Sequence, residues 1–131
     1  MSQKLRVLVL DDEPIVGRRL RPALAKMGWE VEIFEDPRRA LDRLDEAEFD
    51  VVVTDIRMDE MSGIQVLERV RERWPRTRVI LITGYAMMSV ARDAMQKGAF
   101  DFIAKPFRPE ELRAVVARAA EDLAKEAAEP R

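Results

Sequence analysis

The chain has 131 residues, of which 47% are hydrophobic, and its 23 Lys and Arg residues nearly balance 25 Asp and Glu residues, giving a net charge of −2. This size suits one domain with a sizeable core, and the charge balance argues against a strongly basic nucleic-acid-binding surface. The sequence contains no Cys and no His, which excludes disulfides, zinc sites of the usual composition and Cys or His nucleophiles, so a bound metal would be a hard cation such as Mg²⁺ or Ca²⁺.

Strand-like and helix-like segments alternate along the chain. The expected strands are short apolar runs at 5–10, 30–34, 50–54, 78–83 and 99–104. The expected helices have apolar residues at helical spacing and span 14–27, 37–47, 64–74, 86–97 and 109–124. The first, third and fourth strands are continuously apolar, as central parallel strands are, whereas EVEIF alternates and fits an edge strand. Five βα units predict an α/β doubly wound three-layer sandwich.

The first helix carries a conflicting residue. Pro14 suits its first turn, but Pro22 lies inside it, where proline removes a hydrogen bond. We expect a kink near residues 18–21 and no break, because the apolar stripe continues past Pro22. The whole pattern predicts one domain over residues 1–124, followed by a C-terminal tail at 125–131. The apolar runs are far shorter than a membrane helix requires, so we expect a cytoplasmic protein without a membrane span.

Polar residues follow the expected strands at the edge where ligands bind in such sheets. These are Asp11, Asp12 and Glu13 after the first strand, Asp55 after the third, Thr83 at the end of the fourth and Lys105 after the fifth. Each alone is explained by helix capping, a turn or packing. Converging carboxylates, however, repel one another and require a neutralising positive charge. Lys105 and a divalent cation are the two candidates.

Four segments carry a family resemblance. They are VLVLDDEP (7–14), VVVTDIRM (51–58) with MSG (61–63), VILITGY (79–85) and GAFDFIAKPF (98–107). In their order and spacing they resemble the response-regulator receiver domain of bacterial two-component signalling, over residues 5 to about 123. The resemblance implies a flavodoxin-like (βα)5 fold with a five-stranded parallel sheet of order 2-1-3-4-5.

The resemblance also implies roles for individual residues. Asp55 would accept a phosphoryl group as a carboxylate nucleophile. Mg²⁺ would be bound by Asp12 directly, by Asp11 directly or through water, by Asp55, and by the backbone carbonyl of Arg57. Phosphoryl transfer needs positioning and charge neutralisation, which these groups would supply.

Other residues would stabilise the phosphoryl group and switch the domain. Lys105, after a cis peptide bond to Pro106, would contact one phosphoryl oxygen, and the Thr83 hydroxyl would contact another. Phe102 would swing inward as Thr83 moves. The change would reach residues 87–124, the face through which the family binds partners or dimerises.

Two residues could gate the site. Tyr85 is either a half-exposed loop aromatic or a gate over the phosphoryl group, and the Arg57 side chain could screen the acids. One position departs from the family, because Asp59 stands where proline is usual. This puts loop rigidity and kinase docking in doubt, and no role for the charges of Asp59 and Glu60 follows from the sequence.

The resemblance implies a signalling switch with only weak self-catalysed phosphotransfer and dephosphorylation, and not a turnover enzyme. Its partners would be a sensor histidine kinase or phosphotransfer protein and a downstream protein, with no membrane and no direct nucleic-acid binding. An aspartyl-phosphate phosphatase would need a second Asp where Arg57 stands, and a flavin or nucleotide site would need a Gly-rich loop. A phosphorylation-independent interaction module is the remaining alternative. We expect no output domain after the last helix, as in a stand-alone receiver or a truncated regulator.

Overall fold

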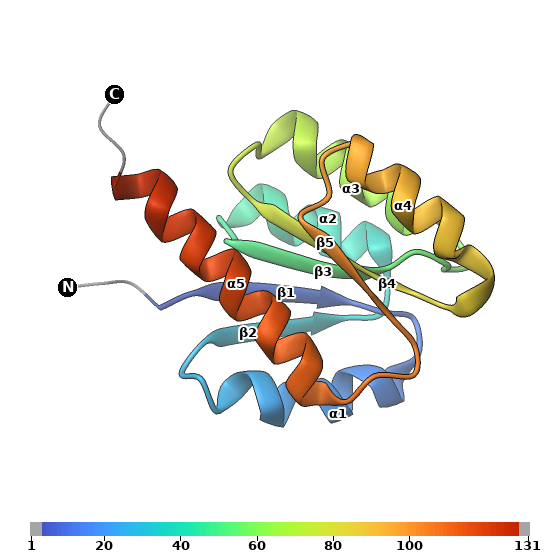
Figure 1. Cartoon of the computed structure of the whole chain (residues 1–131), viewed down its shortest axis with the longest axis horizontal. Coiled ribbons are helices and arrows are strands. Elements are labelled where there is room, and N and C mark those ends of the chain that lie inside the picture. The colour runs from blue at the N-terminus through green and yellow to red at the C-terminus, as the bar shows by residue number, and fades with distance from the viewer. Residues whose placement is uncertain (1–3, 129–131) are drawn as a thin grey trace.

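A computed structural model describes residues 4–128, apart from the side chain of Tyr85. Five strands alternate with five α-helices and one short 3₁₀ helix (Figure 1). The strands are β1 (Arg6–Leu10), β2 (Glu30–Phe34), β3 (Val51–Asp55), β4 (Arg78–Thr83) and β5 (Asp101–Ala104). The helices are α1 (Pro14–Ala25), α2 (Pro37–Glu46), α3 (Gly63–Arg73), η1 (Tyr85–Met87), α4 (Met88–Gln96) and α5 (Pro109–Ala128).

The sheet has the predicted topology. Its strand order is β2-β1-β3-β4-β5, and every pairing is parallel. The predicted doubly wound fold is therefore confirmed, with β2 at one edge. Because all strands run the same way, their carboxyl ends meet at one edge of the sheet.

Two hydrophobic cores cover the two faces of the sheet. Alternate residues of β1 point to opposite faces, so Val7 and Val9 pack with α1 and α5, while Leu8 and Leu10 pack with α2, α3 and α4. Figure 1 shows this division, with α5 and α1 on one side of the sheet and the other helices on the opposite side. The three strands β1, β3 and β4 are buried on both faces, which explains their continuous apolar sequences.

Several element ends differ from the sequence prediction, most by one residue and a few by two or more. Helix α5 continues to Ala128, four residues into the predicted tail, and Arg78 of β4 pairs with Asp122 and Glu126 near its end. Strand β5 begins at Asp101, because the N–H of Ala99 still bonds back to the α4 carbonyl of Ala94. Helix α1 ends at Ala25, two residues before the predicted end.

Pro22 lies inside an unbroken α1. The absence of a break agrees with expectation, while the kink near residues 18–21 stays a prediction. Gly17 explains how closely this helix approaches the sheet, since an added Cβ there would lie 2.4 Å from the Cγ2 of Ile33 in β2.

Gly63, the first residue of α3, packs against the backbone at the end of β3. A Cβ at this position would lie 2.2 Å from the Asp55 carbonyl oxygen and 2.8 Å from the Ile56 Cα. Alanine normally favours a helix over glycine, but here it must displace main chain. We expect Gly63→Ala to lower the free energy of unfolding by about 3 kcal/mol, measured by urea denaturation. Gly84→Ala is the control, because nothing lies within 4 Å of its Cβ position; equal stability of the two variants would contradict the prediction.

Candidate functional site

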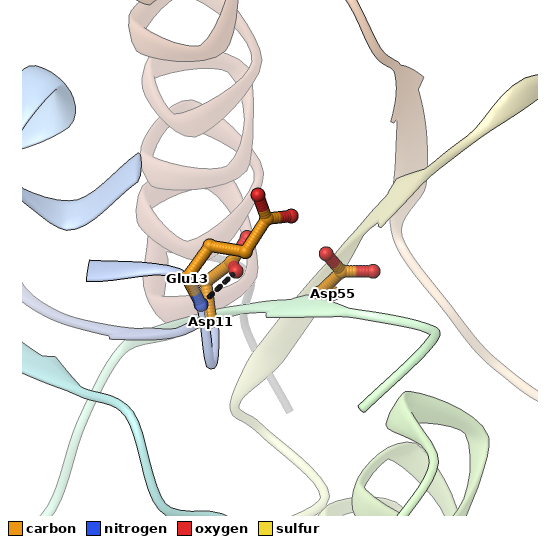
Figure 2. Close-up of side chains that lie close together, drawn as sticks. All are labelled: Asp11, Glu13 and Asp55. Carbon is orange, nitrogen blue, oxygen red and sulfur yellow. Dashed lines mark hydrogen bonds between the residues drawn. The ribbon is translucent and has the colours of Figure 1, made fainter. Parts of the chain in front are cut away.

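Three acidic side chains converge where β1 and β3 end. Asp11 and Glu13 follow β1, and Asp55 is the last residue of the neighbouring β3 (Figure 2). One carboxylate oxygen from each lies within 4.8 Å of the others, a spacing that could hold a metal ion. The sequence prediction that acids meet at this edge of the sheet is thus matched by Asp11 and Asp55.

Backbone groups orient the two buried acids. The N–H of Glu13 donates to Asp11 Oδ1 over 2.9 Å, and the N–H of Arg57 donates to Asp55 Oδ1 over 3.0 Å (Figure 2 shows the first). Asp11 is 1% exposed and Asp55 is 5% exposed. Each therefore has one oxygen fixed by main chain and a second oxygen available to other groups.

Lys105 lies among these acids. Its Nζ is 2.8 Å from Asp55 Oδ2, 3.1 Å from Glu13 Oε1 and 3.5 Å from Asp11 Oδ2. The peptide bond to Pro106 is cis, and the Lys105 N–H donates to the Thr83 carbonyl over 2.8 Å, which ties this loop to the end of β4. Although burial opposes it, the hydrogen bonds to Asp55 and Glu13 raise the pKa of Lys105 above its usual range, so it stays charged.

Asp11 is the carboxylate of this group whose charged form is disfavoured by burial. Burial raises the pKa of Asp11 to about 6, the Asp55 charge adds to the increase, and the Glu13 N–H opposes it. Its Oδ2 is buried without a hydrogen-bond partner among residues 4–128. This oxygen has Lys105 Nζ at 3.5 Å but accepts no hydrogen bond from these residues, and it lies beside two further carboxylates. Such an oxygen fits a hard divalent cation, which prefers oxygen ligands.

The raised pKa of Asp11 leads to a prediction about stability. Between about pH 4 and pH 6 the Asp11 carboxyl binds more protons in the folded protein than in the unfolded chain, so its contribution to stability falls as pH rises through this range. At pH 7.5 without divalent cations, we expect Asp11→Asn to raise the free energy of unfolding by about 2 kcal/mol. The gain should vanish near pH 4 in chemical denaturation, and a gain that is independent of pH would contradict this account.

Asp12 lies outside the group of three. Its Oδ2 accepts a hydrogen bond from the backbone N–H of Asp59 over 3.2 Å. Among the described residues, Asp11, Glu13 and Asp55 form a group that could hold a metal ion, and the role of Asp12 as a direct ligand, which the resemblance implies, stays a prediction. Glu13 was not among the predicted ligands. The sequence feature that could have identified it is its place as the third acid in DDEP.

Thr83 ends β4 and Phe102 lies in β5, and among the described residues the Thr83 hydroxyl makes no hydrogen bond to Asp55. Thr83 is fully buried, and its hydroxyl donates to the Gly84 carbonyl over 3.0 Å. Phe102 is half-buried and packs against the core on the α2–α3–α4 side. Arg57 is exposed, and the side chain of Tyr85 lies outside the part that the structure describes. The roles predicted for these four side chains therefore stay predictions.

A groove opens next to Lys105, between the start of α1 and the loop after β5. Its volume is about 420 Å³, and its lining includes Glu13, Ile15, Arg19, Lys105, Pro106 and Phe107. Ile15 is 61% exposed, the largest exposure among the large hydrophobic residues described as exposed. The site is thus reachable from solvent along a partly apolar surface.

Over residues 4–128, the structure contains no helix with the length and apolar character to cross a membrane.

The family model and the curated relatives that match this chain all point to response regulators. Residues 7–117 match the model of the response regulator receiver domain. The chain is 44% identical over 114 residues to the regulatory protein AtoC of Escherichia coli (strain K12), covering 87% of this chain and 25% of AtoC. It is 35% identical over 117 residues to the DNA-binding transcriptional regulator NtrC of Proteus hauseri, covering 89% of this chain and 25% of NtrC. The chain thus spans about a quarter of the length of these curated relatives.

Solved structures show the same similarity. A CheY-like response regulator receiver domain protein from Methanospirillum hungatei JF-1 superposes with a TM-score of 0.88 at 27% identity, covering 95% of this chain and 99% of that one. A response regulator receiver domain protein from Clostridium thermocellum gives a TM-score of 0.85 at 29% identity, covering 90% and 95% of the two chains.

Proposed function

The chain belongs to the response regulator receiver domain family, and on that premise we propose that it is a phosphoacceptor switch whose phosphorylated residue is Asp55. The donor is a phosphohistidine on a sensor histidine kinase or phosphotransfer protein, the class of partner that family membership implies. The observation that supports the proposal is the position of Asp55, a buried carboxylate at a strand end with Lys105 Nζ 2.8 Å from its Oδ2.

The transfer follows from the chemistry of the carboxylate. An oxygen of Asp55 forms a bond to phosphorus while the P–N bond of the phosphohistidine breaks, and the bonding electrons leave with the imidazole nitrogen. Lys105 holds a positive charge where the phosphoryl oxygens gather. The donor would approach through the groove beside Lys105, because exposed Ile15 and half-buried Phe107 line this groove next to the site.

We place Mg²⁺ at the acidic group. Asp11 and Asp55 would hold it, with Glu13 or Asp12 and the Arg57 carbonyl as further ligands. A bound Mg²⁺ neutralises negative charge on phosphoryl oxygens. The residues fit because Asp11 brings a buried oxygen without a hydrogen-bond partner among the described residues.

The switch would begin at Thr83. Its hydroxyl would leave the Gly84 carbonyl and donate to the new phosphoryl group, and Phe102 would move into the space released. The altered surface would be residues 87–124, used for a downstream partner or a second copy. The side chains of Tyr85 and Arg57 would control the access of water to the acyl phosphate. The rate of hydrolysis by this water would set the lifetime of the phosphorylated state.

One alternative function remains, and one expectation about partners changes. A phosphorylation-independent interaction module would keep the fold without phosphoryl uptake, although the acids, Thr83 and Lys105 are all present. The expectation of no direct nucleic-acid binding by this chain is withdrawn, because relatives such as NtrC are named as DNA-binding regulators.

The proposal is tested by incubating the protein with phosphoramidate, a small phosphodonor, and measuring its intact mass. With Mg²⁺ we expect the mass of one phosphoryl group to be gained, and with excess chelator we expect the gain to be lost, because the carboxylates then repel the incoming phosphoryl oxygens. Uptake that is equal with Mg²⁺ and with chelator would contradict the metal requirement. No uptake in either condition would favour the interaction module.

A further inference from the structure

The Lys105 ammonium is held from two sides. Its Nζ donates to Asp55 Oδ2 over 2.8 Å and to Glu13 Oε1 over 3.1 Å. Over residues 4–128, Glu13 is thus the one hydrogen-bond partner of this ammonium apart from Asp55, the proposed phosphoacceptor. An ammonium has three N–H donors, so a third donor stays available beside these two bonds.

The side chain of Glu13 does not cap the helix that it precedes. Glu13 is the N-cap residue of α1, yet its carboxylate accepts no hydrogen bond from the backbone of that helix. Its main chain is fixed by other bonds, because its N–H donates to Asp11 Oδ1 over 2.9 Å and its carbonyl accepts the Val16 N–H over 3.1 Å. Helix capping, the usual explanation of an acid at this position, therefore does not account for the Glu13 carboxylate. Its contact is with Lys105, 92 positions along the chain.

The transfer of a phosphoryl group would change the partners of Lys105. Once an Asp55 oxygen is bonded to phosphorus, the negative charge lies on the phosphoryl oxygens, so Lys105 must release Asp55 Oδ2 and turn toward one of them. Lysine carries its charge on a flexible four-carbon stem, and the Lys105 side chain is 28% exposed beside the groove. A second bond that does not involve Asp55 keeps the ammonium in place during this exchange, and Glu13 supplies that bond.

We propose that Glu13 is a positioning residue for phosphoryl transfer, whose Oε1 holds the Lys105 ammonium in the site while the ammonium passes from Asp55 Oδ2 to a phosphoryl oxygen. This bond, here called the tether, restricts the stem of Lys105 before the donor arrives, so less freedom is lost in the transition state. The inference rests on the proposed function, because it concerns the same reaction of Asp55. The charge of Glu13 has the opposite effect, since it repels an anionic donor.

Two substitutions of Glu13 separate the hydrogen bond from the charge. Glu13→Gln removes the charge and keeps an oxygen that can accept from Lys105, whereas Glu13→Ala removes both. With saturating Mg²⁺, we expect the maximal rate of phosphoryl uptake from phosphoramidate to be about five-fold lower in Glu13→Ala than in Glu13→Gln, the upper end of what a partly exposed ion pair contributes. The KM for the donor should be the same, because Lys105 reaches the phosphoryl oxygens in the transition state. Equal maximal rates in these two variants would overturn the tether.

Glu72→Ala is the control for the change from Glu to Ala. Glu72 is an exposed residue of α3, and this variant should take up the phosphoryl group at the wild-type rate. The Glu13 side chain is itself 61% exposed, so both Glu13 variants should keep the wild-type circular dichroism. A slowing of Glu72→Ala as large as that of Glu13→Ala would overturn the tether, because the effect would not be specific to position 13.

The dependence on Mg²⁺ distinguishes the tether from a role of Glu13 as a metal ligand. If Glu13 acts as a ligand, calorimetric titration shows weaker Mg²⁺ binding in Glu13→Ala than in Glu13→Gln, and the difference in uptake disappears as Mg²⁺ is raised; this result would overturn the tether. The tether predicts equal Mg²⁺ affinities and a difference in uptake that persists at the highest Mg²⁺ concentration. Uptake by the wild type with equal rates in the two Glu13 variants would retain the function and reject the tether, and no uptake by the wild type would reject both.

Discussion

Asp55→Asn is expected to abolish phosphoryl uptake from phosphoramidate while leaving the fold intact. The amide nitrogen and oxygen of Asn are poor nucleophiles at neutral pH, whereas the Asp55 carboxylate attacks phosphorus directly. The substitution preserves the size of the side chain, and its oxygen can still accept the Arg57 N–H. The measurement is the intact mass after incubation with the donor and Mg²⁺.

The matched control is Asp42→Asn, at an exposed position of α2. It makes the same chemical change away from the site and should gain a phosphoryl group like the wild type. Equal mass gains in Asp55→Asn and Asp42→Asn would place the acceptor elsewhere.

Lys105→Ala is expected to destabilise the protein by about 2 kcal/mol at pH 7.5 without divalent cations. Lys105 is the cation that lies within 3.5 Å of all three carboxylates, and two of those carboxylates are buried. Removing it leaves like charges facing one another in a poorly hydrated site. The figure is smaller than for a fully buried pair because the Lys105 side chain is 28% exposed.

The pH dependence identifies the cause of this loss. As pH falls toward 4 the Asp11 carboxylate, whose pKa burial raises to about 6, takes up a proton and the repulsion weakens, so the variant should approach the stability of the wild type in urea denaturation. Lys97→Ala is the control, since Lys97 pairs with Glu68 at 3.8 Å with both side chains about half-exposed, and such pairs contribute little. A loss in Lys105→Ala that is the same at pH 4 and pH 7.5 would show that packing, and not charge, is responsible.

The fold and the place of Asp55 at the end of a central strand were predictable because their signals are local. Each central strand is a largely apolar run, and each ends on or directly before the polar residue that the parallel sheet brings to the shared edge. The place of Asp55 follows from the end of β3 alone. The position of Lys105 beside Asp55 could be predicted once the order of the strands was known.

The details that the sequence did not reveal depend on contacts between distant residues. Asp12 accepts a hydrogen bond from a backbone N–H 47 positions away, a contact that the DDE run could not show. Arg78 likewise bonds to Asp122 and Glu126 near the end of α5, 44 and 48 positions away. Side-chain direction and helix ends are decided by such contacts, which no local pattern records.

The central claim, that Asp55 carries the phosphoryl group, is tested most directly by locating that group in the wild-type protein. Borohydride reduces an aspartyl phosphate to homoserine, so phosphorylated protein can be reduced, digested and sequenced by mass spectrometry. We predict that the reduced residue is at position 55, and that it is absent when Mg²⁺ or the donor is omitted. A reduced residue at Asp11, Asp12 or Glu13, or none at all in protein that binds Mg²⁺, would contradict the account.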